Sequence, residues 1–179
     1  TIFHNRFHHN TRHGINLNHA HDDASLVWGN DIYVNDGDGI WMTLQTNDNQ
    51  ILHNTITGNG GNGITLGLQD TGIVVVGNAI TFNAGWALAN TGVNDKLARL
   101  DFNDYFGNVV GICSDCVSFG SGDLFTEPLY LDRASYDYRL LGSSILIDAG
   151  DSSLGLDLNG DLAGNYNDAA PDIGAHESP

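Results

Sequence analysis

Basic residues are scarce in this 179-residue sequence. Lysine and arginine together number 6 against 22 aspartates and glutamates, which gives a formal net charge of −16 at pH 7. A nucleic-acid surface needs clustered cations to neutralise phosphates, and an anionic membrane attracts proteins through the same cations. The composition therefore disfavours nucleic acid and membrane surfaces as partners. The sequence also lacks a transmembrane run, so we expect no membrane insertion.

Cysteine is equally scarce, with Cys113 and Cys116 spaced as C-x-x-C. A zinc ribbon needs a second pair of cysteines, and a thioredoxin-like site needs a strand-to-helix context that the neighbouring residues do not offer. Two interpretations remain for this pair. It forms a local disulfide in an exported protein, or it holds two free thiols.

Helical periodicity is absent, because no window of 10 to 12 residues carries apolar residues at helical spacing. This excludes helical and leucine-rich repeats as the main architecture. No signal peptide is visible either. The chain begins inside a repeat unit at Thr1, so we expect an upstream part that this sequence lacks, and the missing signal says little about export.

What the sequence does contain is an internal repeat of about 24 residues, with residues 51–66 (ILHNTITGNGGNGITL) as its template. Two asparagine columns recur at steps of 24 or 25 residues: Asn5, Asn30, Asn54, Asn78 and Asn103, and Asn10, Asn35, Asn59, Asn83 and Asn108. Three apolar columns keep the same step: Ile2, Val27, Ile51, Val75 and Leu100; Phe7, Ile32, Ile56, Ile80 and Tyr105; and Ile15, Ile40, Ile64, Leu88 and Ile112.

The spacing inside one unit predicts three short strands joined by turns. One unit cannot bury its own apolar face, but units stacked at about 4.8 Å form parallel ladders around a continuous core. Asparagine tolerates the left-handed backbone of tight turns, and stacked amides bond from coil to coil. We therefore expect the asparagine columns to be structural ladders.

This repeat resembles the right-handed parallel β-helix proteins, an architecture shared by secreted polysaccharide lyases, glycosidases and epimerases. Residues 123–132 (DLFTEPLYLD), 136–150 (YDYRLLGSSILIDAG) and 171–177 (PDIGAHE) are similar to the closing segments of the choice-of-anchor β-helix proteins of this polysaccharide-lyase-like superfamily. Ser144 replaces the usual proline and His176 the usual tyrosine. The resemblance implies a secreted or cell-surface protein that binds or processes polysaccharide.

The fold expected is all-β, a right-handed single-stranded parallel β-helix (solenoid) of about 24-residue coils with a C-terminal closing segment. Residues 1–120 would form the coils. Residues 121–179 would form closing coils and a cap of the same domain, with last strands at 129–131 and 145–147. The first coil presents open strand edges, and these offer a surface for self-association.

The candidate binding surface is the outward face of the third strand of each coil. Alternation along the strand turns its polar residues outward, and an aromatic ring among hydrogen-bonding groups suits a sugar. The predicted carbohydrate-binding residues are Asn16, Asn18, Asp38, Trp41 and Thr43.

The turn after the first of these strands holds the candidate catalytic residues His19, His21, Asp22 and Asp23. A lyase or epimerase needs a base, for which either histidine serves, and a group that neutralises a uronate, such as Arg12 or calcium. Two alternatives stand beside this interpretation. His19 and His21 hold a metal with the neighbouring carboxylates, or they are solvated residues of a surface turn.

A calcium loop is the third candidate site. Of the 22 acidic residues 20 are aspartate, and the segment DLNGDLAGNYND places oxygen ligands at calcium-loop spacing. The predicted ligands are Asp157, Asn159, Asp161, Asn165 and Asp168. Leu162 stands where such a loop normally has glycine, so a plain solenoid loop is the alternative.

The sequence therefore predicts an exported β-helix domain that binds or processes a polysaccharide or other glycan on its outer strand face. Whether it is an enzyme stays open; the resemblance points to a lyase, glycosidase or epimerase. The alternative is a non-enzymatic structural, adhesive or filament-forming β-helix module. An ice-binding face is disfavoured, because no outward column repeats one residue type such as threonine.

Overall fold

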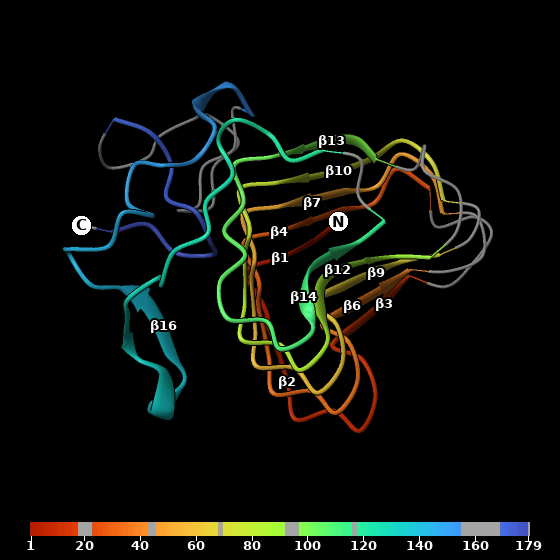
Figure 1. The fold of residues 1–179 in the computed structure, drawn as a ribbon, viewed down its shortest axis with the longest axis horizontal. Coiled ribbons are helices and arrows are strands. Elements are labelled where there is room, and N and C mark those ends of the chain that lie inside the picture. Colours follow the sequence, from red (N-terminus) through yellow and green to blue (C-terminus); the bar gives the residue numbers. More distant parts are fainter. Residues whose placement is uncertain are drawn as a thin grey trace.

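In a computed structural model, the chain forms a parallel β-solenoid whose coils each contribute one strand to each of three sheets (Figure 1). The structure describes residues 1–17, 23–42, 46–67, 70–91, 97–115, 118–154 and 169–178. Sheet A contains β1 (Ile2–Phe3), β4 (Leu26–Trp28), β7 (Gln50–Leu52), β10 (Ile73–Val76) and β13 (Leu97–Asp101). Sheet B contains β2 (Arg6–His8), β5 (Asp31–Tyr33), β8 (Thr55–Thr57) and β11 (Ala79–Thr81). Sheet C contains β3 (Ile15–Leu17), β6 (Ile40–Met42), β9 (Ile64–Leu66), β12 (Trp86–Asn90) and β14 (Gly111–Ser114).

The predicted apolar columns form the core between the three sheets. Val27, Ile51 and Val75 stand in register in sheet A, and Ile32, Ile56 and Ile80 in sheet B. One assignment is wrong: Cys113, not Ile112, stands opposite Leu88 in sheet C. The last coil is one residue longer than the 24-residue step assumed there, as the asparagine columns also are at that point.

Both asparagine columns are hydrogen-bonded ladders. Asn54 is typical: its backbone N–H and its Nδ2 both donate to Oδ1 of Asn78, and its own Oδ1 accepts from Asn30 in the same way. All amides in a column point in one direction, so the donor end faces the C-terminal coil. There Asp123 ends the first ladder, because its Oδ1 accepts from the backbone and side-chain nitrogens of Asn103. A carboxylate suits a ladder end that offers only donors.

The C-terminal segment begins as a partial further coil and then leaves the stack. Leu124 bridges Asp104, after which β15 (Tyr130–Asp132) and β16 (Asp137–Leu140) form an antiparallel hairpin around the 3₁₀ turn η1 (Arg133–Ser135). The other predicted last strand, 145–147, is wrong, since these residues form turns closed by Ser144. Leu146 alone is buried there, so the apolar run marks an anchor rather than a strand. A second 3₁₀ turn, η2, spans Ser152–Leu154.

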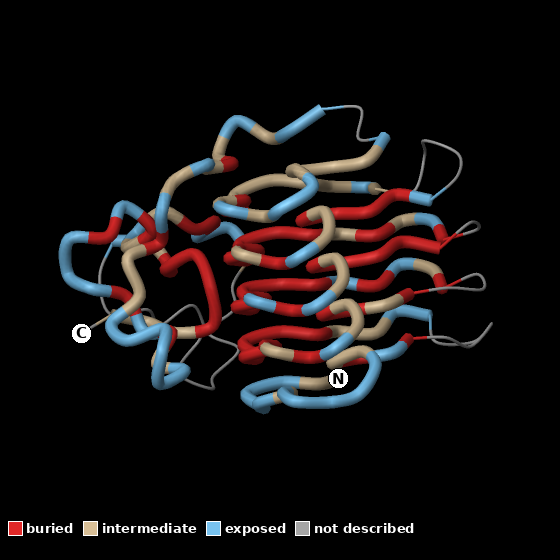
Figure 2. The backbone as a smooth tube through the Cα atoms, turned by 60° about the horizontal axis from the view of Figure 1, so that its bottom comes forward, coloured by how far each residue is buried: buried red, intermediate tan, exposed pale blue. Residues whose placement is uncertain are grey.

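The segment then lies along the side of the coils, over sheet B (Figures 1 and 2). Backbone N–H groups of Gly174 and Ala175 donate to Gly77 O and Thr55 Oγ1, which belong to successive coils. We call this contact of residues 169–178 with the coils the seam. Among the described residues, no helix is long and apolar enough to cross a membrane.

Candidate functional site

The outer face of sheet C carries the predicted binding surface. Asn16, Trp41, Thr65 and Ala89 stand in register across successive strands. Asn16 is exposed, Trp41 is half-buried, and Thr65 and Ala89 are buried. The alternation that the sequence predicts therefore holds, and the structure brings the predicted residues Asn16 and Trp41 side by side.

A second column enters sheet C just before each strand and forms a third side-chain ladder. Nδ1 of His13 accepts from the backbone N–H of Asp38 at 3.1 Å, and Oδ1 of Asp38 accepts from Asn62 N–H at 2.7 Å. Oδ1 of Asn62 in turn accepts from Trp86 N–H at 2.8 Å. The other oxygen of Asp38 accepts from the Thr65 hydroxyl, so its carboxylate is held on both sides.

Trp41 is fixed by a ring stack. The imidazole of His13 lies 4.6 Å from the indole at 14° between planes, so one ring face of Trp41 is covered from the first coil. Phe3 stacks on Trp28 and His8 on Tyr33 in the same way, which joins the first two coils at three places. A sugar at Trp41 would therefore meet the ring edge or the opposite face, on the side of Thr65.

Most of the predicted catalytic group lies outside the described residues, namely Asn18, Thr43, His19, His21 and Asp22. Asp23 is described: it is exposed, and its Oδ1 accepts from the backbone N–H of Asn47 in the next coil at 2.8 Å. That bond connects two turns and assigns Asp23 a structural contact. The predicted calcium ligands Asp157, Asn159, Asp161, Asn165 and Asp168 also lie outside the described residues. Within the described ranges, no group of three or more His, Cys, Asp or Glu side chains is placed to hold a metal.

Sequence reasoning missed a polar cavity of about 240 Å³ where the seam meets the first two coils. Asp31 is buried at its centre, 3.3 Å from Arg6 Nε and 2.9 Å from His176 Nε2. Arg139, Asn5 and Glu177 complete the lining with His4, Gly29 and Ala175. The two guanidiniums match the two carboxylates in number, so the cavity has no formal excess charge with neutral histidines. An aspartate in a column that otherwise holds Thr55 and Ala79 was the available signal.

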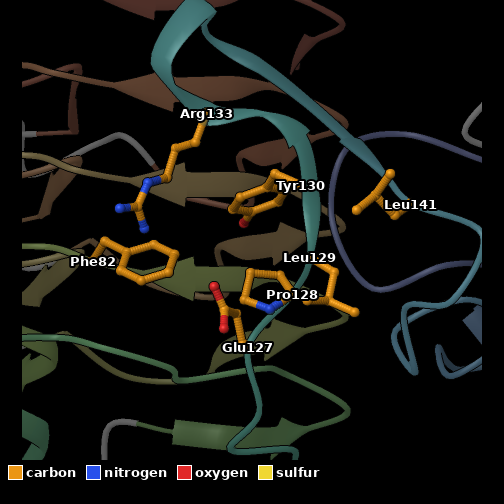
Figure 3. A pocket seen from close by; sticks show the side chains of 7 residues that line it. All are labelled: Phe82, Glu127, Pro128, Leu129, Tyr130, Arg133 and Leu141. Atoms are coloured by element: carbon orange, nitrogen blue, oxygen red, sulfur yellow. The ribbon is translucent and has the colours of Figure 1, made fainter.

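A smaller pocket of about 130 Å³ lies beneath the hairpin (Figure 3). The guanidinium of Arg133 stands 3.8 Å from the centre of the Phe82 ring, and the carboxylate of Glu127 faces the same pocket from below in this view. Tyr130 forms the inner wall, and its hydroxyl lies 3.1 Å from the Thr81 hydroxyl. The guanidinium already covers the Phe82 ring, so the pocket lacks an open aromatic platform.

Two buried ionisable groups differ sharply from their ordinary state. Burial lowers the pKa of His53 to about 4, against a hydrogen bond with Asp172 O that raises it. Burial raises the pKa of Asp104 to about 7, against backbone hydrogen bonds from Thr126 and Tyr105 that lower it. His53 belongs to the seam, whereas Asp104 lies under the partial last coil. Neither faces sheet C, so both are structural rather than part of the candidate site.

Comparison with known proteins gives one match. The family model described as "right handed beta helix region" matches residues 1–99, more than half of the chain. No curated protein and no solved structure matches it. The matched residues contain β1 to β12 and thus the sheet C face around Trp41.

Proposed function

Because this chain belongs to the right-handed β-helix family, we propose that it is an exported domain that binds a polysaccharide on the outer face of sheet C. The observation that carries the proposal is the row of half-exposed rings and polar groups on that face. Trp41 and Trp86 are half-buried, and Asn16, Asp38 and Asn62 stand around them. Aromatic surface with convergent hydrogen-bonding groups is what sugar recognition requires.

The accessibility of the three sheets supports the same face. The outer stripe of sheet A, Trp28, Leu52 and Val76, is buried against residues that include Leu154. The outer face of sheet B lies under the hairpin and the seam, where Tyr33 contacts Tyr138. Sheet C is the sheet whose outer face the described residues leave open. Parallel strands about 4.8 Å apart offer an extended chain a regular series of contacts.

Export is supported by the state of Cys113, which is disulfide-bonded. Disulfides persist in oxidising compartments and are rare in the cytosol of mesophiles. Of the two sequence interpretations, the structure therefore bears out the disulfide and not two free thiols.

Processing of the glycan is a separate part of the proposal. His19 or His21 would act as the base, with Asp22 and Asp23 nearby in sequence and calcium or Arg12 opposite a uronate. These roles rest on the residue types in that turn. Once a glycan is identified, His19→Ala and His21→Ala should abolish any turnover while leaving binding within about twofold.

A structural module is the second candidate, and one observation favours it. The polar groups on sheet C bond to each other: Asp38 accepts from Asn62 and Thr65, and Asn62 Nδ2 donates to Thr65 at 3.0 Å. Such a self-satisfied network stabilises a rigid spacer without any ligand.

A glycan-array screen followed by titration of the best hit separates the two candidates. Trp41→Ala should weaken binding at least tenfold, because it removes the platform but no core residue. Phe125→Ala is the matched control, since Phe125 is an aromatic of 50 % exposure away from sheet C. No binding by the folded wild type would favour the structural module, and unchanged affinity of Trp41→Ala would place the site on another face.

A further inference from the structure

Two histidine side chains in the first coil direct the same ring nitrogen toward one point. Nδ1 of His8 and Nδ1 of His9 lie 2.8 Å apart, and both residues are exposed. At that distance one nitrogen carries a proton that it shares with the lone pair of the other. A site that binds one shared proton between two imidazoles also has the donor atoms for a metal ion.

The fold holds both rings in place. His8 stacks on Tyr33, 4.9 Å away at 12° between planes, and Tyr33 itself is buried. His9 meets Tyr136 edge to face at 5.5 Å, and its Nε2 lies 3.5 Å from the Tyr136 hydroxyl. The left-handed backbone of His9, at φ 54°, belongs to a turn where Val34 and Gly58 of later coils are also left-handed. The arrangement therefore follows from the coil and not from a free surface loop.

We propose that His8 and His9 form a two-imidazole chelate for a divalent transition metal, with Cu²⁺ or Ni²⁺ preferred over Zn²⁺. Imidazole nitrogens bind such metals at about 2.1 Å. Two nitrogens 2.8 Å apart then subtend about 84° at the metal, close to the right angle of square-planar and octahedral sites. A tetrahedral zinc site would need them about 3.4 Å apart.

Proton balance is simple at this site. The metal displaces the single proton between the two Nδ1 atoms, and each imidazole stays neutral with its proton on Nε2. For His9 that proton then points to the Tyr136 hydroxyl, which orients the ligand from its far side. No third His, Cys, Asp or Glu side chain joins the pair among the described residues. Water or an external ligand would fill the remaining positions.

Titration of tag-free protein with Cu²⁺, Ni²⁺ and Zn²⁺, followed calorimetrically, tests the proposal. His8→Ala and His9→Ala should each weaken Cu²⁺ binding at least tenfold. The double variant His19→Ala/His21→Ala is the control, because it removes the rival pair in the sequence, and it should bind as the wild type does. Ni²⁺ should bind more tightly than Zn²⁺.

Electron paramagnetic resonance of the wild type with one equivalent of Cu²⁺ adds a direct measurement and should report two coordinated imidazole nitrogens. Circular dichroism would verify that the exposed-site variants keep the fold. Wild-type affinity in both His8→Ala and His9→Ala, or loss of binding only in the His19/His21 variant, would overturn the assignment. Tighter binding of Zn²⁺ than Ni²⁺ would overturn the right-angle geometry.

Discussion

The coils and the seam are held together by contacts of opposite character. In the coils, a residue bonds to its counterpart 24 or 25 positions away, and the same bond recurs from coil to coil. In the seam, His53 reaches Asp172, Thr55 reaches Ala175, and Asp31 reaches His176, across 119 to 145 residues, and no bond repeats. Repetition makes the coils redundant and leaves the seam dependent on single groups.

The two regions also differ in how they use buried polar groups. Ladder asparagines have neutral amides whose donors and acceptors are paired with other coils. The seam instead relies on an ionisable ring, because His53 is fully buried and its Nε2 has no partner in the described structure. We therefore expect the coils to respond to mutation within a ladder and the seam to respond to pH.

The largest effect should come from breaking a ladder in its middle. Asn54→Ala removes acceptance from Asn30 and donation to Asn78, Val27 O and Leu52 O, all buried. Because several buried groups lose their partner at once, we expect the free energy of unfolding to fall by roughly 4 kcal/mol. Chemical denaturation measures it.

Asn5→Ala is the matched control at the exposed end of the same ladder. Its side chain donates to Phe3 O and, at 3.4 Å, to Asn30, and solvent can replace both bonds. The expected loss is below about 1 kcal/mol. Equal losses in the two variants would mean that the ladder does not act as a bonded column.

The coil columns, both ladders and the outward position of Trp41 were predictable because one period fixes every neighbour. Even the contact of Asp38 with His13 follows from a step of 25 residues. The exception, Cys113 in place of Ile112, arose where the period itself changed by one residue.

The seam was not predictable in this way. Nothing in the spacing of His53 or Asp31 indicates a partner more than a hundred residues later, since seam contacts depend on how the tail folds back. The stack of His13 on Trp41 was hidden for a related reason: adjacency was predictable, but not which ring face a neighbour covers. Asp23 was assigned by residue type to catalysis, and its bond to Asn47 became visible only in three dimensions.

The second effect is acid release of the seam. His53 has a folded pKa of about 4, below its ordinary 6.5, so folding favours the neutral ring. Its contribution is complete above pH 6.5 and is lost as the pH falls from 6.5 toward 4, because the unfolded segment takes up a proton and the folded one does not. The loss amounts to roughly 3 kcal/mol.

Hydrogen exchange of residues 169–178 between pH 7 and pH 4.5 would detect this release, after correction for the intrinsic exchange rate. His53→Gln keeps a donor toward Asp172 O and removes the titration, so its seam protection should be nearly independent of pH. If wild type and His53→Gln lose protection in parallel, His53 is not the cause.

A smaller effect of opposite sign should come from Asp104. Its folded pKa of about 7 lies above the ordinary 3.8, so its contribution is complete below pH 3.8 and falls as the pH rises through 7. Asp104→Asn removes the buried charge but leaves an unpaired amide, so we expect a gain of about 1 to 2 kcal/mol at pH 8 and no gain at pH 4. Thermal melts of Asp104→Asn and of the exposed Asp148→Asn at both pH values test the sign.

Hydroxyl-radical footprinting with and without the glycan identified by the array tests the central claim, that sheet C is the binding face. The account predicts that oxidation of Trp41 and Trp86 falls on binding, while that of Phe119 and Phe125, exposed at the last coil, stays constant. Unchanged oxidation of both tryptophans, together with protection at the last coil or along the hairpin, would contradict it.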